Sequence, residues 1–198
     1  MTKRLVVMLL TPVRWAPPGV APVAFRSALA EDLVDLVAAL AQADGAIAAT
    51  TEDLPLAEAV GWPGMRLYEL AAATPLAALR AAAVDSYDQA AVLAADVPDL
   101  PGMVLGKLLQ PLDVRPVAVA PSLGGPGLFG VAARLPVPDW FPDLDLDTAE
   151  PLAVRAAAPR SGAVAVTPGW HRLRGPADLA RLDPALEGWD ATRALLGG

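Results

Sequence analysis

The chain has 198 residues and a formal net charge of −7, and this length fits one domain with a substantial core. It contains no cysteine, which excludes disulfide bonds, thiolate metal sites and a cysteine nucleophile. Its single histidine, His171, excludes a multi-histidine metal site. Hydrophobic residues make up 55% of the chain, yet no apolar run approaches the roughly 18 residues of a membrane span. The acidic balance and the lack of a basic, aromatic-rich stripe argue against nucleic-acid binding.

The first apolar run, Leu5–Leu10, follows Lys3 and Arg4 as in a signal peptide, but it is too short and leads into Pro12 rather than a cleavage site. We therefore expect a buried strand here and a cytoplasmic protein. In chain order, the patterns predict a strand at 4–10, a proline-rich loop at 11–22, a helix at 25–40, a strand at 46–50, a helix at 53–60, a strand at 65–68, a helix at 75–84, a strand at 90–95, a helix at 102–109, strands at 116–120, 128–133 and 163–167, and helices at 176–182 and 185–198.

Strands that alternate with helices predict an α/β fold, with one doubly wound, mostly parallel sheet and helices on both of its faces. Unbroken apolar runs are typical of strands buried on both sides, so Leu5–Leu10, Ala90–Ala95 and Pro116–Ala120 should be interior strands. The proline-rich loops are too short to be domain linkers, and we expect a single domain over residues 1–198 with a tail helix at 185–198.

Asp96 is the first candidate functional residue, because it directly follows the apolar run Ala90–Ala95. In open α/β sheets, ligands bind outside the carboxyl ends of the strands. Pro98 lacks a backbone donor and should end the strand pairing, which leaves Asp96 at that edge. An aspartate at this position can also serve only to organise the turn into the next helix, and the position alone favours that interpretation.

Three segments, in order, are similar to motifs of one bacterial family. Asp96–Leu100 (DVPDL) resembles its D-C-P-D-L, Pro121–Gly130 (PSLGGPGLFG) resembles its P-x-x-D-G-G-Y-x-L-x-G, and Pro168–Leu182 resembles its P-x-W-x-D-V-D-T-P-E-D-L-A-R-L. The family is that of glycosyltransferase-A-like proteins of unknown function, related to nucleotide-diphospho-sugar transferases. The same segments are similar to the guanylyltransferases that activate phospholactate in deazaflavin cofactor synthesis.

This resemblance implies a Rossmann-like glycosyltransferase-A domain that uses a nucleotide or nucleotide-sugar ligand. It places Asp96 in a catalytic role as a ligand of Mg²⁺ or Mn²⁺, a common means of neutralising a diphosphate. Asp99 is a second candidate metal ligand, with capping of the following helix as its alternative role. Gly124 and Gly125 permit close backbone approach and should line the substrate pocket, unless they only form a tight turn.

The sequence also departs from the family pattern at charged positions. The basic K-T-R-L run has no equivalent, and Arg14 is the only nearby cation. Arg172 and Arg174 replace the two acids of D-V-D, where they should repel a metal but can bind phosphate directly. The segment Asp143–Thr148 contains D-L-D-T, but it precedes the last strand and is expected to be a solvated acidic loop.

Three functions therefore remain open. The first is a transferase that uses a nucleotide-activated sugar donor, and the second is a divergent protein that binds a ligand or partner without turnover. The third is a nucleotidyltransferase of the phospholactate guanylyltransferase type. The sequence determines neither the donor and acceptor nor the oligomeric state. For a working metal-dependent enzyme, we expect Asp96→Asn to abolish turnover and to leave stability nearly unchanged.

Overall fold

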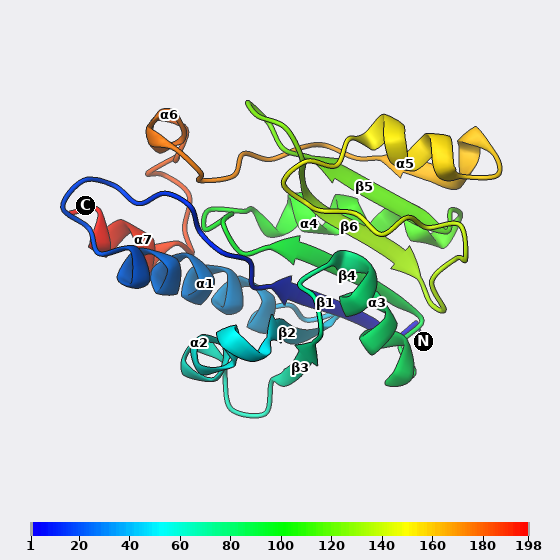
Figure 1. Ribbon diagram of the computed structural model, residues 1–198, viewed down its shortest axis with the longest axis horizontal. Helices are drawn as coiled ribbons and strands as arrows, with labels where there is room; N and C mark the ends of the chain where they lie inside the picture. Colours follow the sequence, from blue (N-terminus) through cyan, green and yellow to red (C-terminus); the bar gives the residue numbers. More distant parts are fainter. Residues whose placement is uncertain (1, 198) are drawn as a thin grey trace.

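The computed structural model describes residues 2–197. Met1 and Gly198, the two ends of the expected domain, lie outside the described residues, and Gly198 is also the last residue of the expected tail helix. Residues 2–197 form a seven-stranded sheet in the order β3-β2-β1-β4-β6-β5-β7. Its strands are β1 (Arg4–Leu9), β2 (Asp44–Thr50), β3 (Arg66–Leu70), β4 (Gln89–Ala94), β5 (Val117–Pro121), β6 (Leu128–Arg134) and β7 (Val164–Val166). The predicted α/β sheet is confirmed, and β1, β4 and β5 are interior strands as expected (Figure 1).

The sheet is parallel except at β6, which pairs antiparallel with both β4 and β5. The short loop from Pro121 to Leu128 explains the exception. A parallel neighbour needs a crossover of a dozen or more residues, whereas a short loop reverses the chain into a hairpin. The carboxyl ends of β1, β4 and β5 therefore meet at one edge of the sheet, which we call the carboxyl edge.

Within residues 2–197, seven α-helices accompany the strands: α1 (Pro22–Ala38), α2 (Leu54–Val60), α3 (Pro75–Val84), α4 (Gly102–Leu109), α5 (Pro151–Ala157), α6 (Pro176–Leu179) and α7 (Asp190–Leu195). The sequence patterns predicted α3 and α4 with the observed bounds. They missed α5, since Val154 is its only buried residue and no apolar period marks it. The expected tail helix is reduced to α7, because the chain turns at Gly188 with a φ of +90°.

Helices cover both faces of the sheet. Buried side chains of α1, α2 and α4 pack on one face with Val6 and Met8, while α3 and α5 pack on the other with Leu5 and Val7. In Figure 1, α3 and α5 lie in front of the sheet and α4 behind it. No helix within residues 2–197 has the length and hydropathy needed to cross a membrane.

A third, smaller cluster joins the two ends of the chain beside the carboxyl edge. Phe25 and Leu29 of α1 pack against Leu173, and Trp15 lies edge-on to Phe25 with 5.8 Å between the ring centroids. Leu195 of α7 packs on the same cluster. The loop after β1 is thereby held against the C-terminal part of the chain, next to the loops that follow β4 and β5 (Figure 1).

Asp32 of α1 holds α7 in place. The residue is 2% exposed, and its carboxylate accepts the backbone N–H groups of Ala191 and Thr192, both at 2.8 Å. Burial raises the pKa of Asp32 above its usual 3.8, and the hydrogen bonds from α7 only partly oppose this change. A raised pKa means that ionisation of Asp32 opposes folding, so its net contribution to stability is greatest below pH 3.8 and declines as the pH rises through its folded pKa.

We predict that Asp32→Ala lowers the free energy of unfolding by about 1 kcal/mol at neutral pH, because two N–H groups at a helix start lose their acceptor. The loss should be larger below pH 3.8, as the sign of the pKa change requires. Urea unfolding at several pH values measures both effects. The neighbouring exposed Glu31→Ala is the control, and equal stabilities of the two variants would contradict the capping role.

Candidate functional site

A strap of residues 168–175 crosses the carboxyl edge. Its backbone is hydrogen-bonded to the ends of two strands: the Leu173 N–H donates to the Asp96 carbonyl at 2.8 Å, and the Trp170 N–H donates to the Pro121 carbonyl at 3.2 Å. The Leu123 N–H in turn donates to the Trp170 carbonyl at 2.9 Å. These contacts bring the strap over residues that lie about fifty to eighty positions earlier in the chain.

The strap places Arg172 directly on Asp96. The Arg172 Nε donates to Asp96 Oδ1 at 2.6 Å, and Nη2 donates to Oδ2 at 2.9 Å, so the pair is bidentate. The Arg172 side chain is 1% exposed and that of Asp96 is 9% exposed. Asp96 thus lies beyond the end of β4, where the sequence places it, but both of its oxygens are bound to an arginine.

Asp147 joins this pair. Its Oδ1 lies 2.7 Å from Arg172 Nη2, and Arg172 Nη1 donates to the carbonyls of Leu128 and Leu146 at 3.2 and 3.0 Å. Burial alone lowers the pKa of Arg172, but Asp96 and then Asp147 outweigh burial, and the net effect is a raised pKa. The guanidinium therefore keeps its charge at the floor of the site.

Sequence reasoning did not include Asp147 in the site, because it lies in the acidic segment expected to be a solvated loop. Gly127 is the signal that could have placed it. A Cβ at Gly127, where φ is +95°, would come within 2.7 Å of the Asp147 carbonyl and closer still to that of Leu146. The Leu128 N–H also donates to the Leu146 carbonyl at 2.8 Å, so the acidic segment lies against the start of β6.

Arg174 lies beside Arg172 and is less fully bound. Its Nη2 donates to the Pro126 carbonyl at 2.6 Å and to Ser122 Oγ at 3.3 Å, and its side chain is 27% exposed. Burial, followed by the positive charge of Arg172, lowers the pKa of Arg174. A lowered arginine pKa indicates a cation that lacks full compensation, and an anion bound next to Arg174 would supply it.

Two adjoining hollows share Arg172 and Arg174, and we call them together the cleft. One, of about 280 Å³, is lined by Pro12, Val13, Arg14, Asp96, Asp147, Thr148, Arg172 and Arg174. The other, of about 320 Å³, is lined by residues 122–126, Arg172, Arg174, Gly175 and Asp178. The structure therefore brings the candidates Arg14, Asp96, Gly124, Gly125, Arg172 and Arg174 together. Three arginines face two aspartates in the first hollow, and Asp178 in the second brings the cleft as a whole to three arginines and three aspartates.

Asp99 is not among the residues that line the cleft. Its carboxylate accepts the Trp170 Nε1–H at 3.1 Å, lies 3.0 Å from His171 Nε2, and is fully buried. It does not cap α4 either, since α4 starts after Pro101 without a side-chain cap. Asp99 instead contacts Trp170 and His171 of the strap, and its role as a metal ligand stays a prediction.

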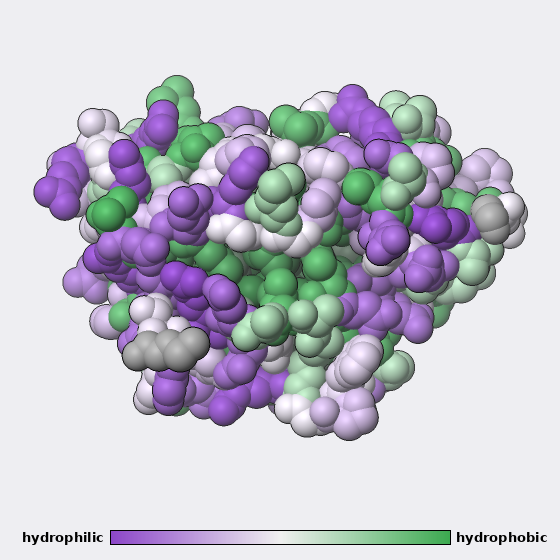
Figure 2. Space-filling model, turned by 180° about the vertical axis from the view of Figure 1, so that it is seen from behind, coloured by the Kyte–Doolittle hydropathy of each residue, from purple (hydrophilic) through white to green (hydrophobic). Residues whose placement is uncertain are grey.

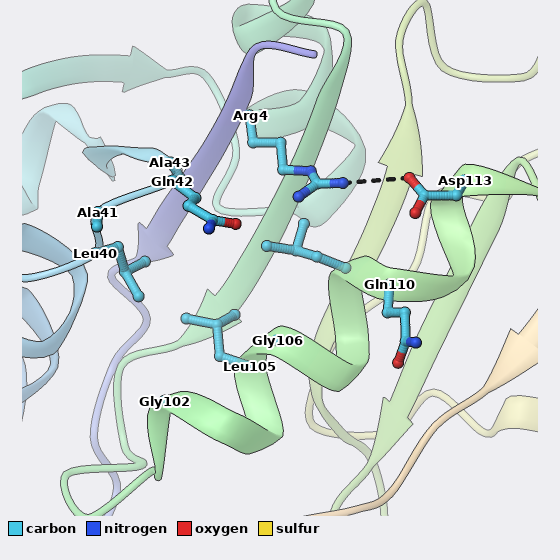
Figure 3. Close-up of a pocket in the computed structure, with 11 residues that line it drawn as sticks. Arg4, Leu40, Ala41, Gln42, Ala43, Gly102, Leu105, Gly106, Gln110 and Asp113 are labelled. Carbon is cyan, nitrogen blue, oxygen red and sulfur yellow. Dashed lines mark hydrogen bonds and ion pairs between the residues drawn. The ribbon is translucent and has the colours of Figure 1, made fainter. Parts of the chain in front are cut away.

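A further hollow, of about 390 Å³, lies between the α1–β2 loop and α4 (Figure 3). Arg4 is its cationic side chain, and it is paired with Asp113 at 3.2 Å. Leu40, Leu105 and Leu109 supply much of the remaining lining. In the view from behind, apolar side chains gather near the centre of the surface with polar ones around them (Figure 2). Because the arginine here is compensated, this hollow suits an anion less well than the cleft does.

Comparison with known proteins gives a result at the level of the fold. No protein-family model matches the sequence, and no curated protein matches it. Among solved structures, a proposed nucleotide-diphospho-sugar transferase from Desulfovibrio desulfuricans G20 aligns with a TM-score of 0.69 and 20% identity over 100% of this chain and 98% of that one. This chain has the nucleotide-diphospho-sugar transferase fold.

Other structures with this fold extend the comparison. CMP:2-keto-3-deoxy-manno-octonic acid synthetase, solved with CTP, aligns with a TM-score of 0.61 and 13% identity over 99% of each chain. Glucosyl-3-phosphoglycerate synthase from Mycobacterium tuberculosis, solved with Mn²⁺, UDP and phosphoglyceric acid, aligns with a TM-score of 0.58 and 14% identity over 98% of this chain and 77% of that one. The fold is thus shared with both nucleotidyl and glycosyl transferases.

Proposed function

We propose that this protein binds a nucleotide or nucleotide-activated sugar in the cleft, with the ligand's phosphates on Arg174 and Arg14. The observation that carries this proposal is the position of the Arg174 side chain, which is 27% exposed, lines the cleft beside Arg172 and, within residues 2–197, has only a long ion pair of 3.8 Å with Asp147. The lowered pKa of Arg174 agrees with this position. Guanidinium groups bind phosphate oxygens through charge-assisted hydrogen bonds. Arg14 is exposed, and within residues 2–197 it has no ion pair with any side chain.

The position of the cleft supports the same ligand class. In open α/β sheets, ligands bind at the carboxyl edge, and the cleft lies at the ends of β1, β4 and β5. Two proteins of the same fold were solved with nucleotides, one with CTP and the other with UDP. Gly124 lets the Arg181 guanidinium lie against the loop, where Arg181 Nη1 donates to the Leu123 carbonyl at 2.7 Å, and Gly125 lies beside Arg174.

The state of the carboxylates favours ligand binding without metal-dependent turnover among the three functions. Asp96 and Asp147 are both bound to Arg172, and Asp178 accepts the Arg174 backbone N–H at 3.1 Å. A general base or metal ligand needs an available carboxylate, and Asp96 has both of its oxygens on Arg172, whereas Asp147 and Asp178 each have one oxygen engaged. The catalytic role of Asp96 stays a prediction. Nucleotidyl transfer is the second candidate, because the synthetase solved with CTP matches this chain over nearly its full length.

Calorimetric titration of the protein with nucleoside triphosphates, nucleoside diphosphates and nucleotide sugars tests the proposal. We expect saturable binding of at least one of these compounds. Arg174→Ala should weaken that binding by about 10- to 100-fold, as the loss of a charge-assisted hydrogen bond of roughly 1.5–3 kcal/mol implies. The exposed Arg80→Ala on α3 is the control and should bind normally. No binding by the wild type, or equal binding by both variants, would refute the proposal, and pyrophosphate release would favour nucleotidyl transfer.

A further inference from the structure

A cage of oxygen atoms surrounds the Arg172 guanidinium at the floor of the cleft. Asp96 contributes two carboxylate oxygens, Asp147 contributes one, and Leu128 and Leu146 contribute their carbonyls. These five oxygens lie 2.6 to 3.2 Å from the guanidinium nitrogens. Four of these contacts are hydrogen bonds and the fifth, with Asp147, is an ion pair, so all three guanidinium nitrogens of Arg172 are engaged by the protein.

Such a cage has the chemistry of a cation site. Carboxylate and carbonyl oxygens are the ligands that Mg²⁺ and Mn²⁺ prefer in proteins. The Arg172 Nη2 alone lies within 3 Å of one oxygen from each of the two aspartates, so a single positive centre at that point contacts both. The cage is also located at the end of β4, directly beside Arg174, where the proposed phosphate would bind.

The residues present do not fit a divalent metal on Asp96. An ion that approached would meet the positive charge of Arg172 and find both Asp96 oxygens engaged. Within the described chain, no three His, Cys, Asp or Glu side chains are grouped so that they could hold a metal ion. The Arg172 side chain is 1% exposed and its backbone neighbour Leu173 is hydrogen-bonded to Asp96, so the guanidinium is fixed in the cage.

We propose that the Arg172 guanidinium is a resident cation that takes the place of a divalent metal ion, so that this protein binds its phosphate ligand without Mg²⁺ or Mn²⁺. Metal-independent binding of a phosphate ligand rests on the proposed function, whereas the occupation of the oxygen cage by Arg172 does not depend on any ligand. Arg172 is a positioning residue here. It holds Asp96 and Asp147 and supplies positive charge behind Arg174, which meets the ligand.

The first experiment uses Mn²⁺ alone, without nucleotide, so that it does not depend on the proposed function. Mn²⁺ is titrated into the wild type and into Arg172→Ala, and the free ion is measured by electron paramagnetic resonance. The wild type should show no saturable binding. Arg172→Ala should bind one ion per chain at least about tenfold more tightly than any wild-type binding, because the emptied cage keeps its oxygens.

Two controls assign the binding to the cage. Arg172→Ala combined with Asp96→Asn should lose the gained Mn²⁺ affinity, since one of the two Asp96 oxygens becomes an amide NH₂ group and the other loses its charge. Arg174→Ala, in which a neighbouring cleft arginine outside the cage is removed, should not gain Mn²⁺ affinity.

Ethylguanidinium should compete with Mn²⁺ for the cage of Arg172→Ala, whereas ethylammonium, which has fewer donors, should compete less.

Folding of Arg172→Ala is followed by circular dichroism, because the variant can lose its structure when the cage is empty. In that case, recovery of the native spectrum by millimolar Mn²⁺ or ethylguanidinium supports the proposal, and no recovery by either overturns it. Saturable Mn²⁺ binding by the wild type that disappears in Asp96→Asn also overturns it. A folded Arg172→Ala that binds no Mn²⁺ would overturn it as well.

A nucleotide titration of the wild type in the presence of Mg²⁺ or of a chelator then tests whether the phosphate ligand binds without a metal. Equal nucleotide affinities in the two conditions are expected.

Discussion

Removal of the Arg172 guanidinium is expected to lower the free energy of unfolding by about 3 kcal/mol or more, the range observed when one partner of a buried ion pair is removed. Arg172→Ala leaves the largely buried carboxylate of Asp96 without its cation, removes the Arg172 donor from the Leu128 carbonyl, and leaves the Leu146 carbonyl with only the Leu128 N–H of its two donors. Asp147 is 27% exposed and can recover some hydration, so the loss should lie near the lower end of that range.

Urea unfolding at neutral pH, in a buffer free of divalent metals and guanidinium, measures this loss. The control is Arg155→Ala, which removes an exposed arginine in the last turn of α5 and should cost little. A loss below about 1 kcal/mol for Arg172→Ala would place the pair in the class of surface salt bridges, contrary to its burial. The loss of unfolding free energy for Arg172→Lys should lie between those for Arg172→Ala and Arg155→Ala, because a lysine ammonium keeps the charge but cannot form the bidentate contact with Asp96.

The same ion pair changes the expectation for Asp96. From its sequence position alone, Asp96→Asn should leave stability nearly unchanged, as expected of a carboxylate at a solvent-exposed edge. In the structure, Asp96 is buried against Arg172, so the substitution weakens a charged, bidentate contact. We now expect Asp96→Asn to destabilise the protein by about 1.5–3 kcal/mol, the usual contribution of a charged hydrogen bond. Any loss of activity in this variant must therefore be corrected for the folded fraction.

The second large effect is expected at Gly127. Gly127→Ala should lower the free energy of unfolding by about 2–4 kcal/mol, the combined effect of a strained φ and of overpacking against backbone. Its φ is +95°, and an added Cβ would collide with the carbonyls of Leu146 and Asp147. These atoms belong to backbone and cannot rotate away as the end of a side chain does. The acidic segment would have to move, and Asp147 would move away from Arg172.

Gly19→Ala is the matched control for Gly127→Ala. Gly19 also has a positive φ, +84°, but no atom lies within 4 Å of its added Cβ. It should therefore show only the conformational cost, about 1 kcal/mol. Urea unfolding gives both values, and hydrogen exchange of the Leu128 amide, which donates to Leu146, reports local opening. Similar losses for the two glycine variants would show that the close approach of residues 146–147 contributes nothing.

Local pattern was sufficient to predict most of the sheet. The apolar runs Leu5–Leu10 and Ala90–Ala95 became interior strands because they have no polar residue that could face water on either side. The helix α3 was predicted with the observed bounds since Thr74 and Pro75 mark its start. Position after a strand likewise placed Asp96 at the carboxyl edge. These features follow from residues close together in the chain, so the sequence by itself determined them.

The partners of the charged side chains were decided only by the tertiary structure. The sequence showed that Arg172 and Arg174 reverse the charge of the family pattern. It did not show that the strap carrying them folds back onto Asp96 and the 122–126 loop, which lie about fifty to eighty residues earlier in the chain. Asp147 entered the site because Gly127 admits the backbone of a segment that sequence reasoning had assigned to solvent. Unlike the apolar residues of a strand or helix, charged residues do not recur at a spacing that reveals which residues they pair with. Whether a carboxylate in this protein is a free ligand or half of an ion pair is determined by which backbones the fold brings together.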